Sequence, residues 1–142
     1  MKTIKFLLLL LVIPFFGISQ TTIFTENFGT PAATTSVATY TGFQNYGVQT
    51  YAGNADVRTT LPSSGYVGSS GNGNLFVTNT LNTNLVISGI NTLNYNTLSL
   101  TLAILKTTNG SKGAELGVQY SPDGVVWTDL VFTMGTGTGS SN

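Results

Sequence analysis

The clearest pattern in the chain is a strict alternation of apolar with small or polar residues between positions 98 and 104. The apolar positions are Leu98, Leu100, Leu102 and Ile104. Successive side chains of a β-strand point to opposite faces, so a period of two places one face on a core and the other toward water. We therefore predict a β-strand over residues 98–104 and expect the rest of the sheet to be organised around it.

Two turn signals follow this segment and predict two further strands. The signals are Asn109-Gly110 and the Pro-Asp-Gly sequence at 122–124, whose residues accept positive φ or fix φ. Between them, alternation predicts a strand with Leu116, Val118 and Tyr120 pointing inward. A third strand is predicted over 125–130, which contains Trp127, the only tryptophan.

The rest of the chain predicts short strands separated by turns. Strands are predicted at 22–28, 55–60, 75–79, 85–90 and 131–134, with an irregular strand in the aromatic segment 40–51 and loops at 32–39 and 63–74. From residue 20 onward, no segment has the i, i+3, i+4, i+7 pattern of an amphipathic helix. This spacing predicts an all-β fold, a β-sandwich or a barrel, and we favour an antiparallel β-sandwich.

The first 19 residues have the organisation of a secretory signal peptide. Lys2 and Lys5 precede an apolar run at 6–18, and Gly17 and Ser19 provide small residues before a cleavage point. The run is 13 residues long, whereas a membrane-spanning helix needs about 20. We expect cleavage after Ser19, no membrane span afterwards, and a secreted protein that is extracellular or on the cell surface. The predicted β-sandwich domain occupies 20–134.

The charge and cysteine content exclude some functions. After residue 19 the cations are Arg58, Lys106 and Lys112, and the acids are Glu26, Asp56, Glu115, Asp123 and Asp129. Three scattered cations cannot neutralise a row of phosphates, so nucleic-acid binding is not expected. Without cysteine, the fold must depend on strand pairing and apolar packing.

Residues 135–142 (GTGTGSSN) have no strand pattern. They are either a flexible linker or the point at which a loop is truncated, and we favour truncation, with the closing strands absent. The domain is therefore predicted to be incomplete, with an open sheet edge at which a second chain can pair.

Several motifs resemble a known family. The sequence ISGINT at 87–92, the Leu-alternating strand and VQYSPDG at 118–124 followed by Trp127 resemble the jelly-roll, galactose-binding-like domains near the N-terminus of secreted bacterial multidomain proteins. The Glu26-Asn27-Phe28 start fits as well. Such proteins often carry a C-terminal sorting domain for type IX secretion, and some carry nuclease, protease or lamin-tail-like modules downstream.

The resemblance implies a jelly-roll scaffold and transfers no catalytic residue. Those domains usually close with one or two further strands beside the first strand, and nothing after Met134 matches these. This departure again indicates an incomplete domain.

Enzymatic chemistry is not expected. The chain has no His and no Cys, which excludes Ser–His and Cys–His pairs. A glycosidase requires two carboxylates that flank the bond. Asp123 lies in a predicted turn, and Glu115 and Asp129 lie at outward strand positions, which leaves Glu26 and Asp56 as a poor candidate pair.

Aromatic residues provide the candidate ligand-binding site. Tyr46, Tyr51 and Trp127 can stack on sugar rings, and Tyr46 and Tyr51 have Gln and Asn neighbours that can bind hydroxyls. The alternative is a structural role: a single Trp in a small sandwich usually lies in the core, and we expect this of Trp127.

No cofactor is predicted, although related sandwiches hold a structural Ca²⁺. Glu26, Asp56 and the oxygen-rich 72–74 segment are the candidates, but their spacing matches no dedicated calcium loop. A turn explains 71–73 better.

The leading hypothesis is a non-catalytic secreted module for binding or adhesion, with a polysaccharide or other glycan as the candidate ligand. The alternative is a structural spacer that positions a downstream hydrolase or nuclease domain. A third option is self-association through the open sheet edge.

Overall fold

The computed structural model describes residues 20–59, 73–78, 82–106, 116–132 and 139–141. Within these ranges the chain contains strands and no helix, and every strand pair is antiparallel. This confirms the predicted all-β antiparallel class; the sandwich arrangement stays a prediction. The predicted signal peptide lies outside the described residues, and none of the described segments is a helix that could span a membrane.

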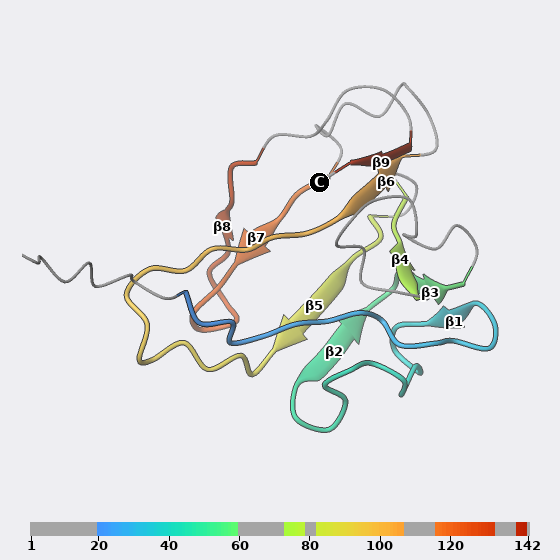
Figure 1. Cartoon of the computed structure of the whole chain (residues 1–142), viewed down its shortest axis with the longest axis horizontal. Helices are drawn as coiled ribbons and strands as arrows, with labels where there is room; N and C mark the ends of the chain where they lie inside the picture. Colours follow the sequence, from blue (N-terminus) through green and yellow to red (C-terminus); the bar gives the residue numbers. More distant parts are fainter. Residues whose placement is uncertain (1–19, 60–72, 79–81, 107–115, 133–138, 142) are drawn as a thin grey trace, which may run out of the picture.

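The strands form four small sheets in the part of the chain that the structure describes (Figure 1). The strands are β1 (Thr35–Ser36), β2 (Thr50–Gly53), β3 (Asp56–Arg58), β4 (Asn74–Phe76), β5 (Leu85–Ser88), β6 (Ile104–Lys106), β7 (Gln119–Tyr120), β8 (Thr128–Asp129) and β9 (Gly139–Ser141). The sheet orders are β1-β3-β4, β2-β5, β6-β9 and β7-β8.

The core lies around the central strand β3. Val57 of β3 is fully buried between Thr35 of β1 and Leu75 of β4. The other buried apolar residues of the described chain are Val37, Phe43 and Ala55. Strand β2 pairs with β5 beside this cluster, and its Tyr51 packs against it. The core is therefore small and is formed by residues 37–57.

A close backbone approach joins the segment before β1 to the start of β4. Phe28 and Gly29 both have positive φ, 59° and 57°, which is uncommon for a bulky residue such as Phe28. Three hydrogen bonds stabilise this turn: Phe28 N to Glu26 Oε1, Gly29 N to Asn27 Oδ1, and the Tyr40 hydroxyl to Phe28 O. A Cβ on the buried Gly73 would lie 2.4 Å from Phe28 O, so glycine is required at position 73.

The segment predicted to organise the sheet is not a strand over most of its length. Only Ile104 belongs to a strand, β6, whereas 98–103 has no ladder partner among the described residues. Leu98 and Leu100 are 56% and 59% exposed. The alternation is real, but a ladder also needs a neighbouring strand in register, which a local pattern does not specify.

Other strand predictions were partly right. The strands predicted at 55–60, 75–79 and 85–90 overlap β3, β4 and β5, whereas 22–28 has no strand. In the predicted strand with inward Leu116, Val118 and Tyr120, Tyr120 is exposed. Residues 139–141, predicted to be a flexible tail or part of a truncated loop, form β9 against β6; the other residues of 135–142 lie outside the described residues.

Candidate functional site

The β7–β8 hairpin is shaped by a turn that its own side chains stabilise. Asp123 Oδ1 accepts hydrogen bonds from Val126 N and Val125 N at 2.9 and 2.8 Å and from Ser121 Oγ at 3.0 Å. Gly124 has φ 74° and donates from its N–H to Ser121 Oγ. Hydrogen bonds from the Val126 and Val125 amides, then from Ser121, lower the pKa of Asp123. The turn thus keeps a charged carboxylate on the exposed tip.

The register of the hairpin separates its two faces. Gln119 pairs with Asp129 and Tyr120 with Thr128, and Leu130 N donates to Val118 O, which continues the same register. Because side chains alternate along a strand, Val118, Tyr120, Thr128 and Leu130 share one face. Gln119 and Asp129 share the other, and their side chains are hydrogen-bonded at 2.8 Å. Trp127 lies one residue before β8, at a position that continued strand alternation assigns to the face of Asp129.

Trp127 is 43% exposed and therefore lies outside the core. The expectation that it would be buried was wrong, because the core forms around β3 and the hairpin lies apart from it (Figure 1). An exposed indole provides an apolar surface, and the amide of Gln119 and the carboxylate of Asp129 on the same hairpin provide a donor and an acceptor. This arrangement can bind a ligand that has both apolar and hydroxyl-bearing edges.

Tyr51 has a structural setting. Its ring stacks on Phe43 with a centroid distance of 3.9 Å and an interplanar angle of 2°. Its hydroxyl donates a hydrogen bond to Glu26 Oε2. Burial, followed by the hydrogen bond and the negative charge of Glu26, raises the pKa of Tyr51 to about 12. One ring face and the hydroxyl are thus occupied within the protein.

Tyr46 is 56% exposed in the turn that leads to β2. Its N–H donates to Phe43 O, and it forms an isolated bridge with Gln49. The three aromatic candidates therefore have three different settings: Tyr46 in a turn, Tyr51 against the core and Trp127 on the hairpin. Only Tyr46 and Trp127 present much of their surface to solvent.

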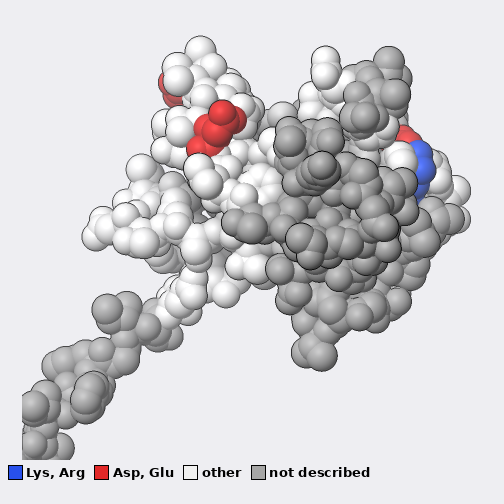
Figure 2. Space-filling model, turned by 90° about the horizontal axis from the view of Figure 1, so that it is seen from above, with Lys and Arg blue, Asp and Glu red and all other residues white. Residues whose placement is uncertain are grey.

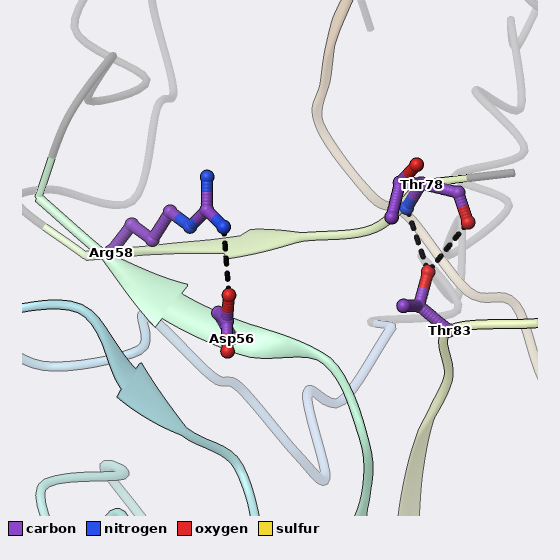
Figure 3. A network of polar contacts seen from close by, with 4 residues as sticks. All are labelled: Asp56, Arg58, Thr78 and Thr83. Carbon is purple, nitrogen blue, oxygen red and sulfur yellow. Dashed lines mark hydrogen bonds and ion pairs between the residues drawn. The ribbon is translucent and has the colours of Figure 1, made fainter. Parts of the chain in front are cut away.

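The two calcium candidates are already engaged by the protein. Glu26 Oε1 accepts hydrogen bonds from the N–H groups of Phe28 and Gln44 at 2.8 and 2.9 Å, and Oε2 accepts from Tyr51. Asp56 Oδ2 lies 2.7 Å from Arg58 Nη2 (Figure 3). Within the described ranges, no three His, Cys, Asp or Glu residues form a group that could hold a metal ion.

Arg58 also connects two strands of the three-stranded sheet. Its guanidinium carbon lies 3.7 Å from the ring centroid of Phe76, the β4 residue that pairs with Asp56. In the same region, Thr83 Oγ1 donates to Thr78 O and accepts from Thr78 N, both at 2.7 Å (Figure 3). Through the ion pair and the contact with Phe76, Asp56 and Arg58 have structural roles in β3.

An apolar hollow lies on the other side of the hairpin. It has a volume of about 140 Å³ and is lined by Leu100, Leu102, Val118, Leu130, Val131 and Phe132. On the face shown in Figure 2, charged side chains are few and most of the described surface is uncharged.

Sequence analysis did not identify the Gln119–Asp129 pair as part of a site. The signal was present, because both residues were predicted to point outward from neighbouring strands. What the sequence could not provide was the register that places Gln119 and Asp129 opposite each other. Comparison of this chain with family models, curated proteins and solved structures found no match.

Proposed function

We propose that this chain is a non-catalytic, exported binding module that binds a neutral carbohydrate at the Trp127 face of the β7–β8 hairpin. The observation that carries the proposal is the half-exposed indole of Trp127, two residues before Asp129, whose carboxylate accepts a hydrogen bond from Gln119. A pyranose ring has an apolar face that stacks on an indole and equatorial hydroxyls that need partners at its edge. Export is inferred from the signal-like segment 1–19.

The polar neighbours favour a neutral sugar over an acidic one. Gln119 and Asp129 are exposed, and together they supply an amide donor and carboxylate acceptors for hydroxyl groups. The Asp129 carboxylate would repel a uronic acid or a sulfated sugar placed on the indole, since like charges in close contact are unfavourable. Neutral hexose polymers are therefore the proposed ligand class.

The settings of the acids support a role without catalysis. Glu26 accepts three hydrogen bonds, Asp56 pairs with Arg58, Asp123 holds the turn and Asp129 accepts from Gln119. Each of these described carboxylates already has a partner in the chain. A glycosidase needs two carboxyl groups facing one bond, and these four residues have other roles.

A glycan array probed with the wild-type chain and three variants tests the proposal. Trp127→Ala should abolish binding to neutral glycans. Tyr120→Ala is the matched control, because it removes an exposed aromatic from the opposite face of the same hairpin and should leave binding intact. Equal loss in both variants, or loss only in Tyr46→Ala, would refute the Trp127 site. No binding by the wild type to any glycan would favour the spacer function.

A further inference from the structure

Residues 98–103 are the most strand-like sequence in the chain and have no strand partner in the part of the chain that the structure describes. Their backbone groups make no hydrogen bond to other described backbone groups. Within the described residues, the hydrogen bond that this segment makes is between side chains, from Gln20 Nε2 to Ser99 Oγ. The segment runs directly into β6, which among the described strands pairs with β9 on one edge and with no strand on the other. An exposed edge of this kind is ready to accept another strand.

The exposed side chains of this segment are apolar on one face. Leu98 and Leu100 are more than half exposed, and Leu100 and Leu102 reach the apolar hollow beside the hairpin. Ser99, Thr101 and Ala103 are exposed on the alternate positions. A strand that pairs here must therefore be apolar on one face and small or hydroxyl-bearing on the other.

A second copy of the same segment meets this requirement. When two copies run antiparallel with Thr101 opposite Thr101, Leu100 faces Leu102 and Leu98 faces Ile104, each pair occurring twice. Opposite residues in an antiparallel pair point to the same face. This register places apolar beside apolar on one face, and Ser99 beside Ala103 with the two Thr101 residues on the other.

Charge does not oppose this pairing. Residues 98–104 contain no charged side chain, so two copies meet without like-charge repulsion, which ordinarily protects sheet edges. The contact is isologous, because the same residues are used on both copies. An isologous contact produces a closed dimer and adds no further copies.

We propose that two copies of this chain form a dimer by antiparallel pairing of residues 98–104, with Thr101 on the two-fold axis. The proposal is independent of carbohydrate binding, since residues 98–104 include none of the residues assigned to the Trp127 site. Other occupants of the edge, such as a strand from an unrelated protein, would leave the purified chain monomeric.

Cysteine cross-linking tests the register directly, because the natural chain contains no cysteine. Thr101→Cys places two thiols opposite each other and should give a covalent dimer under mild oxidation. Ser99→Cys is the matched control: its two copies are offset by four residues, roughly 13 Å, too far for a disulfide. Equal cross-linking of both variants, or of neither, would overturn the proposal.

Sedimentation equilibrium of the wild-type chain, expressed from the full sequence, provides a second test that needs no cysteine. A concentration-dependent dimer is expected, and Leu100→Lys should weaken it by about tenfold because it removes two apolar cross-strand pairs. A wild-type chain that stays monomeric, or a Leu100→Lys chain that dimerises as the wild type does, would overturn the proposal even where the cysteine variants fold poorly.

Discussion

The hydroxyl of Tyr51 donates a hydrogen bond to the carboxylate of Glu26, 25 positions earlier in the sequence. The same carboxylate accepts the N–H groups of Phe28 and Gln44. Glu26 therefore joins the irregular N-terminal segment, the turn before β2 and β2 itself. Among the described residues the N-terminal segment before β1 forms no strand, and the hydrogen bonds of Glu26 help to attach it to the rest of the fold.

Removing the Tyr51 hydroxyl should destabilise the fold while leaving the ring stack on Phe43. Tyr51→Phe is expected to lower the free energy of unfolding by about 1–2 kcal/mol, because a hydrogen bond to a charged acceptor is lost at a partly buried site. Urea unfolding measures the change. Tyr46→Phe, at an exposed hydroxyl, is the control and should be neutral. An unchanged urea midpoint for Tyr51→Phe would show that the hydrogen bond from Tyr51 to Glu26 does not stabilise the folded protein.

Alkaline pH should weaken the fold through the same residue. The pKa of Tyr51 rises from 10.0 to about 12 in the folded protein, so between these values the folded state keeps a proton that the unfolded state has lost. The stabilisation is complete below pH 10 and is lost as pH rises through about 12. Burial, with the charge of Glu26, also raises the pKa of Tyr40. Tyr51→Phe should therefore reduce this pH dependence without removing it, and equal slopes in both chains would contradict the assignment.

Gly73 should tolerate no side chain. In Gly73→Ala the new Cβ would lie 2.4 Å from Phe28 O and 2.7 Å from Gly29 O, both backbone atoms. Overpacking of this kind typically costs about 1–3 kcal/mol. Gly117→Ala is the control, since a Cβ there meets nothing within 4 Å. Thermal melting of the two variants should differ clearly, and similar midpoints would show that the 28–29 turn can move away.

Truncation of Val57 should reveal where the stability resides. Val57 is 0% exposed, so Val57→Ala leaves a cavity and should cost about 1–3 kcal/mol. Val131→Ala removes the same atoms from a fully exposed position and should stay within about 0.5 kcal/mol of wild type. Denaturant unfolding compares them, and equal losses would place part of the core around Val131.

The sequence predicted the fold class because turn residues and β-branched segments recur throughout the chain. The strands β3 and β5 fall inside predicted segments because Val57 and the run Leu85–Ser88 lie between turn signals. The turn at Asp123 was also predicted, because an Asp side chain in a turn accepts a hydrogen bond from the backbone amide two residues ahead, here Val125.

The contacts that involve distant residues were not predictable. Glu26 and Tyr51 meet through packing around Phe43, which no local pattern encodes. Gly139–Ser141 has low β-propensity yet forms β9, since pairing to β6 outweighs the intrinsic preference of these residues. In the candidate site, Trp127 was predicted as an aromatic candidate, whereas its exposure and its polar neighbours depend on the hairpin register.

All four buried apolar residues described in this chain lie between positions 37 and 57, which has a consequence for the order of folding. During synthesis or export from the N-terminus, these residues emerge together, and short loops separate them, so little chain entropy is lost in bringing them into contact. We expect pulsed hydrogen exchange to protect the amide of Val37, which donates to Ala55 O, before the amide of Leu130, which donates to Val118 O in the hairpin. Earlier protection in the hairpin would show that folding starts at the other end of the molecule.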